Sequence, residues 1–243
     1  MNLKIKDIIN LHRVKNFNQS FNKYGITEIK NTIADISNSG SSNSKKKYYF
    51  SGLDNLQNSV FGIFIIYRDE IFSFKSFILR NSKVDWNLSS VLIPKLGAKY
   101  ITRSLNQSRN NIIIDRLSCF NLCFVQEMDK KERENNFLVY KNQNSETLVS
   151  TLNTNFNYFE NHSKKNNFNL AIITGSNDLD ILKIIDRLEP DSKCFIIYPA
   201  MKELINIDLY KYLHKKRIEL VGVSELHLDN LYEDLDQKVH KLY

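Results

Sequence analysis

Two short, nearly continuous apolar runs in the C-terminal third limit the possible folds of this chain more than any other feature. They are residues 170–175 and 193–199, and residues 178–188 between them carry apolar side chains at helical spacing. Strands that are apolar on both faces occur centrally in parallel sheets covered by helices, and right-handed crossovers join them. The pattern therefore predicts an α/β protein, with Ile172 and Ile173 buried in a central parallel strand.

Earlier in the chain, apolar and polar residues predict a β-hairpin. Residues 60–67 and 71–79 read as two strands around a polar turn. Residues 37–47 are rich in Ser, Asn, Gly and Lys, which is typical of a linker. We therefore divide the chain into an N-terminal helix with a polar linker, residues 1–47, and one folded α/β domain, residues 48–243.

A cationic stretch centred on a glutamine is the strongest candidate for a functional site. Residues 89–98 read as an extended segment that delivers residues 99–109 as a loop at a strand end, where binding residues often lie. Arginine and lysine can hold phosphates, and the side chain of Gln107 can orient a water molecule. The same pattern is also typical of a solvated sheet edge.

Five residues of this stretch carry a family resemblance: Tyr100, Thr102, Arg103, Gln107 and Ser108. Their order, a segment close to Tyr-Thr-x-Arg and then Gln-Ser, resembles the catalytic domain of the ribosome quality-control release factors. This is the ankyrin-repeat and zinc-finger peptidyl-tRNA hydrolase family, related to the central domain of peptide-release factors. The resemblance covers about residues 60–215, without the zinc finger and the ankyrin repeats. It implies a release-factor central-domain-like, RNase H-like mixed sheet with an N-terminal hairpin and flanking helices.

The resemblance also implies a function. It predicts a peptidyl-tRNA hydrolase or tRNA 3′-end nuclease that releases nascent chains from stalled large ribosomal subunits, with that subunit and tRNA as partners. Gln107 would be the catalytic residue. The side chains expected to bind RNA are Lys95, Lys99, Tyr100, Thr102, Arg103, Ser108 and Arg109. The glycine pair of the family is replaced by Leu105 and Asn106, which leaves open a catalytically inactive ribosome-binding or RNA-binding protein.

A second motif keeps a metal-dependent ribonuclease of the PIN/NYN type open. Residues 174–179 resemble the strand-end Ser-Gly-Asp-x-Asp of those enzymes, so Asp178 and Glu146 could hold Mg²⁺ or Mn²⁺. However, Ser176 stands where the first acidic ligand is expected. A carboxylate at the start of a helix is also favoured by the helix dipole alone.

Composition adds weaker expectations. With 34 Lys+Arg against 27 Asp+Glu, the net charge of +7 favours an acidic partner. The three cysteines form no zinc or disulfide pattern, and no apolar run is long enough to span a membrane, so we expect a cytoplasmic protein without a metal. The glycines are too scattered for a phosphate-binding loop, so we expect no small-molecule cofactor. Those glycines are Gly62, Gly97 and Gly175.

Overall fold

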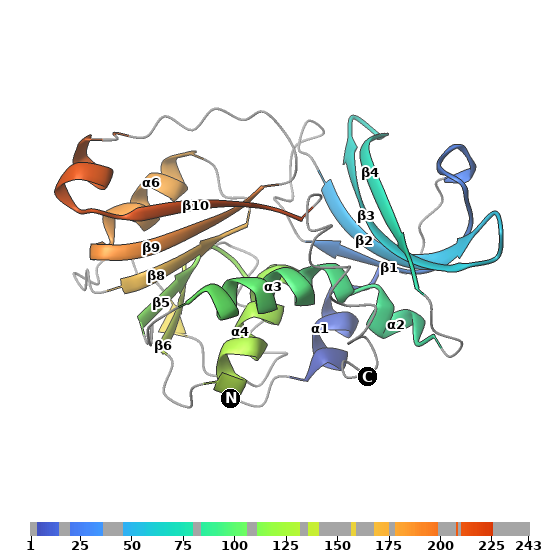
Figure 1. Cartoon of the computed structure of the whole chain (residues 1–243), viewed down its shortest axis with the longest axis horizontal. Helices are drawn as coiled ribbons and strands as arrows, with labels where there is room; N and C mark the ends of the chain where they lie inside the picture. The colour runs from blue at the N-terminus through green and yellow to red at the C-terminus, as the bar shows by residue number, and fades with distance from the viewer. Residues whose placement is uncertain are drawn as a thin grey trace.

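The computed structural model places two sheets side by side, an antiparallel sheet near the N-terminus and a parallel sheet after it (Figure 1). The described residues are 4–14, 20–35, 46–79, 84–105, 111–131, 136–140, 157–158, 168–174, 178–198, 208 and 210–225. Within them, no helix is long and apolar enough to cross a membrane.

The antiparallel sheet has the order β1-β2-β3-β4. Its strands are β1 (Ile26–Asp35), β2 (Lys46–Asp54), β3 (Ser59–Tyr67) and β4 (Glu70–Ile78), and helix α1 (Ile5–His12) and a 3₁₀ turn η1 (Asn22–Tyr24) precede them. β3 and β4 confirm the predicted hairpin. Its two-residue turn has positive φ at Arg68 and Asp69, as the twist of hairpin strands requires.

The second sheet has the order β10-β9-β8-β5-β6-β7, and all of its pairings are parallel. Its strands are β5 (Asn111–Ile114), β6 (Asn136–Val139), β7 (Asn157–Tyr158), β8 (Phe168–Ile173), β9 (Leu188–Tyr198) and β10 (Glu219–Ser224). Counted along the chain from β5, the sheet reads 6-5-4-1-2-3. This is a doubly wound order, which reverses direction between β5 and β8.

Helices cover both faces of the parallel sheet. They are α3 (Leu92–Ser104), α4 (Cys119–Lys131), α6 (Asp178–Asp186) and a π-helical turn η2 (Tyr210–Lys215), whereas α2 (Trp86–Ser89) contacts β1 and β2 of the antiparallel sheet. The side chains of β9 alternate between the two faces of the sheet and pack against helices on each face. Phe195 belongs to the apolar cluster that includes α3 and α4, whereas the next residue, Ile196, belongs to the cluster that includes α6. The predicted burial of Ile172 and Ile173 is confirmed, because both lie in β8 between β5 and β9.

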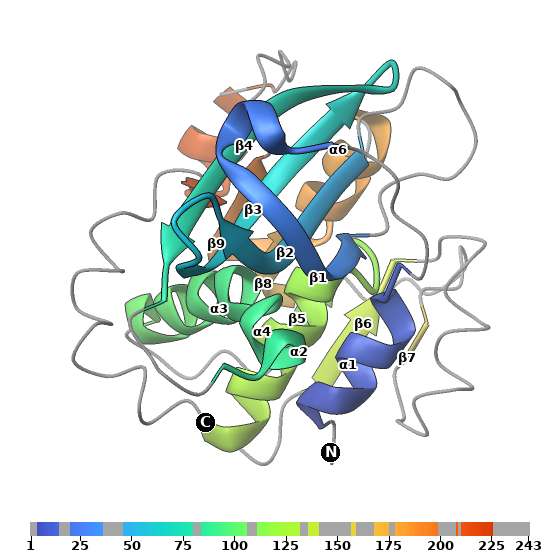
Figure 2. The ribbon, with the colours of Figure 1, turned by 90° about the vertical axis from the view of Figure 1, so that its right-hand side faces the viewer.

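The helices α1, α2, α3 and α4 lie together below the antiparallel sheet when it faces the viewer (Figure 2). Ile8 and Ile9 of α1 are buried in the same apolar cluster as Phe120 and Phe124 of α4. Helix α1 is therefore part of the core. The boundary that we predicted at residues 47 and 48 lies inside β2.

Two predictions about the fold are wrong. The sheet is not the mixed, RNase H-like sheet of a release factor, because its strands are all parallel and doubly wound. In addition, residues 89–98, predicted to be extended, span the end of α2 and the first half of α3. Pro94 lies in the first turn of that helix, where its missing N–H would have no partner within the helix. Gly97 lets α3 pack closely against α4, because a Cβ at this position would lie only 2.6 Å from the ring of Phe120.

Candidate functional site at the carboxyl edge of the parallel sheet

The topology indicates where a ligand would bind. In doubly wound sheets, the binding crevice lies at the carboxyl ends of the strands, where the strand order reverses. Here that point is between β5 and β8, so Asp115 and Thr174, which follow these strands, mark it. β10 points toward the antiparallel sheet (Figure 1), which places β1 and β2 opposite this edge.

Four buried polar residues fill this point, and we call them the switch-point cluster: Asp115, Ser118, Asn121 and Thr174. The backbone N–H of Thr174 donates to Oδ2 of Asp115 over 3.0 Å, and its hydroxyl donates to Oδ1 over 3.1 Å. The side-chain amide of Asn121 donates to the same Oδ1 over 2.8 Å. Asp115 therefore bridges the ends of β5 and β8 across the place where a crevice is expected.

A second group of four buried residues lies between the two sheets, and we call it the interlayer cluster: Asp35, Lys47, Tyr49 and Glu225. Nζ of Lys47 is 2.6 Å from Oδ2 of Asp35 and 2.6 Å from Oε2 of Glu225. The hydroxyl of Tyr49 donates to Oε1 of Glu225 over 2.6 Å. Asp35 ends β1, Lys47 and Tyr49 are in β2, and Glu225 follows β10. The cluster thus joins the antiparallel sheet to the edge of the parallel sheet.

The N-terminus of α4 connects the two clusters. The backbone N–H of Cys119, the first residue of α4, donates to Oδ1 of Asp35 over 2.8 Å. The N–H of Asn121 donates to the hydroxyl of Ser118 over 3.1 Å, so Ser118 acts as the N-cap. Two of the free N–H groups at this helix end are therefore held by the protein's own oxygens.

Burial and charge set the protonation of the interlayer cluster. Burial alone would raise the pKa of Asp35, but Lys47 and the Cys119 N–H outweigh it and lower that pKa. Burial raises the pKa of Glu225, and Lys47 opposes this only in part. Burial, and then the two carboxylates, raise the pKa of Tyr49 well above its ordinary value. Burial would lower the pKa of Lys47, but the carboxylates outweigh it and raise that pKa. Lys47 is therefore a permanent cation and Tyr49 a permanent donor, which suits a fixed ion cluster better than proton transfer.

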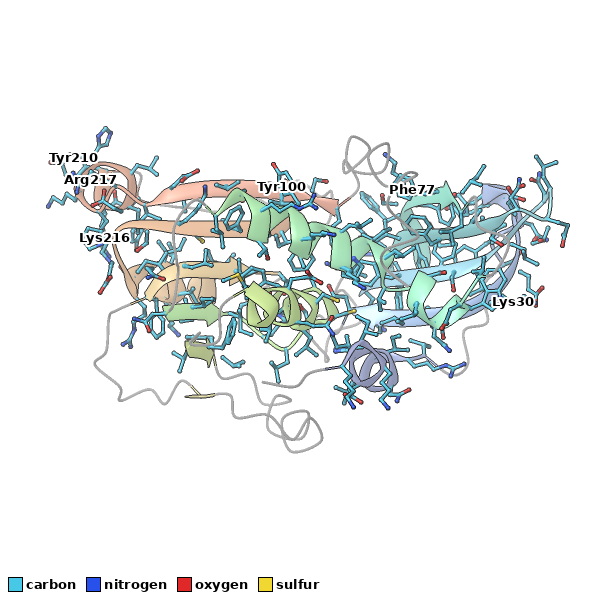
Figure 3. All side chains as sticks on the ribbon, turned by 60° about the horizontal axis from the view of Figure 1, so that its bottom comes forward. Lys30, Phe77, Tyr100, Tyr210, Lys216 and Arg217 are labelled. Atoms are coloured by element: carbon cyan, nitrogen blue, oxygen red, sulfur yellow. The ribbon has the colours of Figure 1, made fainter. Side chains whose placement is uncertain are left out.

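The residues that sequence reasoning selected lie elsewhere. Five of them are on α3 instead of in a loop: Lys95, Lys99, Tyr100, Thr102 and Arg103. Thr102 is buried and donates to the Ala98 carbonyl over 2.9 Å, whereas Tyr100 is 42% exposed on the outer side of α3 (Figure 3). The other three, Gln107, Ser108 and Arg109, lie outside the described residues, as does Glu146. The phosphate contacts given to these side chains stay predictions. The extended segment that was to carry Lys95 and the loop that was to carry the other four are wrong, because all five residues are helical.

Sequence reasoning missed both clusters. Residues 37–47 were assigned to a linker, although Lys47, Tyr49 and Ser51 alternate along β2 and are all buried. A lysine in step with buried strand residues is a signal that could have been used. Its partner Glu225 could not have been found in this way, because it lies 178 residues later in the chain.

Comparison with known proteins gives a fold without a family. No protein-family model matches the chain, and no curated protein matches it. Among solved structures, a thermostable alcohol dehydrogenase from Pyrobaculum aerophilum matches with a TM-score of 0.52 and 10% identity, over 84% of this chain and 74% of that chain. A short chain alcohol dehydrogenase from E. coli CFT073, complexed with NADH, matches with a TM-score of 0.51 and 11% identity, over 79% and 71%.

A third match is the quinone oxidoreductase from Coxiella burnetii, with a TM-score of 0.51, 12% identity and coverage of 79% and 67%. At these identities the likeness establishes the fold alone. The chain has the fold of dehydrogenases and reductases, in which a doubly wound parallel sheet is the part that binds dinucleotides.

These matches correct the functional predictions. The resemblance to release factors is wrong, because the matching structures are dehydrogenases and reductases. Peptidyl-tRNA hydrolysis, tRNA or RNA cleavage and partnership with the ribosome and tRNA lose their basis with it. The expectation of no small-molecule cofactor, which rested on scattered glycines, also needs correction. One matching structure holds NADH, so a dinucleotide is the ligand that this fold implies.

The residues at the site do not fit that ligand. A dinucleotide-binding turn has the pattern G-x-G-x-x-G between its first strand and helix, so that the pyrophosphate can approach the helix N-terminus. At the same spacing after β5, this chain has Arg116, Ser118 and Asn121. All three are buried, and Asn121 fills the space that the third glycine would leave between helix and strand. The carboxylates of Asp115 and Asp35, which pair with Arg116 and Lys47, already occupy the end of β5 and the Cys119 N–H.

Proposed function

We propose that this chain is a non-redox protein on the dehydrogenase fold, which keeps the two-sheet architecture and serves as a rigid binding or scaffolding protein without hydride transfer. The observation that carries the proposal is the carboxylate of Asp115. It accepts hydrogen bonds from Thr174 and Asn121 at the point where the fold would receive a pyrophosphate. The guanidinium of Arg116 also pairs with this carboxylate over 3.2 Å, so side chains of the protein itself occupy this point.

Displacing this carboxylate would be unfavourable. The hydrogen bonds that hold Asp115, and its ion pair with Arg116, would break if the carboxylate moved aside, and Thr174 and Asn121 would then lose buried partners. A buried donor left without a partner costs about 1–3 kcal/mol, which is roughly one to two powers of ten in affinity.

A second candidate function is an oxidoreductase that uses NADH or NADPH. The strand order favours it, and so do the names of the matching dehydrogenases. It requires the switch-point cluster to open and the loop from Asp115 to Ser118 to take a different path. The two candidates differ in one property, which is saturable binding of a dinucleotide.

Thermal unfolding with NADH or NADPH tests the proposal. A ligand with a Kd of about 10 µM, added at about 1 mM, stabilises a protein by about 2.7 kcal/mol, or roughly 5–11 °C in Tm for a domain of this size. We expect no rise beyond that seen with inorganic pyrophosphate, which controls for anion binding to a chain of net charge +7. The E. coli enzyme whose structure holds NADH is the positive control. A saturable rise with either dinucleotide above the pyrophosphate control would establish the oxidoreductase candidate instead.

We also propose the cytoplasm as the location of the protein. The support is that Cys119, Cys123 and Cys194 are all buried free thiols. Free thiols of this kind are typical of a reducing compartment. Fractionation of the native host cells, followed by detection of the chain with an antibody, would test this location.

A further inference from the structure

The N-terminus of α4 is a place where physical chemistry favours an anion. The first N–H groups of a helix have no partners within the helix, and the helix dipole adds partial positive charge there. In α4, the Ser118 hydroxyl holds the N–H of Asn121, and the Ser118 carbonyl accepts the N–H of Leu122. The N–H of Cys119 has its acceptor outside the helix.

That partner is a carboxylate from a different sheet. Oδ1 of Asp35 accepts the Cys119 N–H over 2.8 Å, although the two residues are 84 positions apart in the chain. Oδ2 of Asp35 is 2.6 Å from Nζ of Lys47 and 3.3 Å from the hydroxyl of Tyr49. A helix N-terminus, a lysine and a hydroxyl therefore surround one anionic group, which is also the set of donors that suits a phosphate.

We propose that Asp35 is an internal anion that takes the place of a ligand phosphate at the N-terminus of α4 and so fastens the antiparallel sheet to the parallel sheet without a cofactor. The inference rests on the proposed function, because a bound pyrophosphate would need the same N–H group. It goes beyond that function by assigning a role to a residue of β1, outside the parallel sheet.

Lys47 extends the contacts of Asp35 from one sheet to the other. Its Nζ contacts both Asp35 and Glu225, so one cation connects β1, β2 and the end of β10. Tyr49 adds a hydrogen bond from β2 to Glu225. With Asp35 held on α4 as well, the strand pair β1–β2 is tied to two separate elements of the parallel layer.

Anion rescue tests this role. Asp35→Ala removes the carboxylate and leaves a small space beside the Cys119 N–H and Lys47. We expect Tm to fall by roughly 6–20 °C, as for a buried ion pair that loses one partner. Formate at about 100 mM should then restore several degrees in this variant and raise the wild-type Tm by less than about 1 °C. Asp191→Ala, which removes an exposed carboxylate, is the control that formate should not affect.

A second variant and a local measurement keep the test decisive. Asp35→Asn preserves the shape, so it covers the case in which Asp35→Ala does not fold. We expect it to lower Tm without rescue by formate, because the amide still fills the space. In Asp35→Ala, formate should shift the backbone amide resonance of Cys119. The inference is overturned if both variants keep the wild-type Tm, or if formate leaves Asp35→Ala and its Cys119 resonance unchanged. Binding of NADH by the wild-type chain would refute the proposed function separately.

Discussion

The two ends of the parallel sheet carry the same kind of ion pair in opposite surroundings. At the carboxyl end, Lys47 lies between Asp35 and Glu225, and all three side chains are nearly closed to water. At the amino end, Arg217 pairs with Asp191, and their side chains are 69% and 62% exposed (Figure 3). Water screens the exposed pair, so either partner can be lost at little cost. When the pair is buried, loss of one partner lowers the free energy of unfolding much more.

The difference shows which end of the sheet contributes more to stability. At the amino end, the charged side chains lie on the surface. At the carboxyl end, they occupy the place where the fold would hold a ligand, and they satisfy the donors that such a ligand would use. The carboxyl end is therefore closed by the protein itself. The following substitutions test this comparison, from the largest expected effect to the smallest.

Lys47→Met should have the largest effect. It leaves Asp35 and Glu225 buried without their cation, which should cost about 3–5 kcal/mol of unfolding free energy. Chemical denaturation measures this directly. Lys30→Met is the matched control, because Lys30 is also on a strand but pairs with Glu28 at the surface. We expect the control to lose no more than about 1 kcal/mol. Equal losses in the two variants would remove the distinction between buried and exposed pairs.

Asp115→Ala should come second. It removes the acceptor of the Thr174 N–H and the ion pair with Arg116, whereas the Thr174 hydroxyl keeps Ser118 and the Asn121 amide keeps the Arg116 carbonyl. A buried donor that loses its acceptor costs about 1–3 kcal/mol. Asp54→Ala is a matched control at the surface, since Asp54 accepts three hydrogen bonds from Leu56 and Asn58 in a turn. Water can replace those bonds, so the control should lose less stability in the same denaturation experiment. A larger loss in the control would contradict the role of Asp115 in bridging the ends of β5 and β8.

A pH series on Glu225→Gln should show a smaller, signed effect. Burial raises the pKa of Glu225 above its ordinary value of 4.5. The stability that this group contributes is therefore fully present below pH 4.5, and it is lost as the pH rises through the folded-state pKa. The variant lacks this titration. The wild-type Tm minus the variant Tm should therefore decrease from about pH 4 to about pH 8. A difference that grows with pH would show that Lys47 overcomes burial at this position.

Arg217→Ala should have the smallest effect. The guanidinium and its partner Asp191 are mostly exposed, so the loss should be below about 1 kcal/mol and should shrink further in about 0.5 M salt. Differential scanning calorimetry at low and high salt can measure it. A loss that matches that of Lys47→Met would show that the amino end carries as much of the stability as the carboxyl end.

Local patterns in the sequence predicted the elements whose residues face the core at a regular period. Apolar runs identified β8 and β9, and helical spacing between them identified α6. The hairpin of β3 and β4 was predicted for the same reason. These patterns need only neighbours in the chain, and tertiary structure did not override them.

The site could not be predicted in this way, because it depends on distant parts of the chain. The ion cluster joins Asp35 and Lys47 to Glu225, and the α4 cap joins Cys119 to Asp35. No local period marks such pairs. The strand order could not be predicted from local patterns either. Residues 111–131 contain β5 and then α4, and their apolar residues are buried by packing against α3 and β8.

Hydrogen exchange at the Cys119 amide in the wild-type chain tests most directly whether the N-terminus of α4 is closed by the protein's own carboxylate. Exchange can be followed by NMR without ligand and again with about 1 mM NADH. We expect strong protection without ligand, because Asp35 holds this N–H in a buried hydrogen bond, and no change when NADH is added. Rapid exchange without ligand that becomes slow with NADH would contradict this and show that the helix end is a cofactor site.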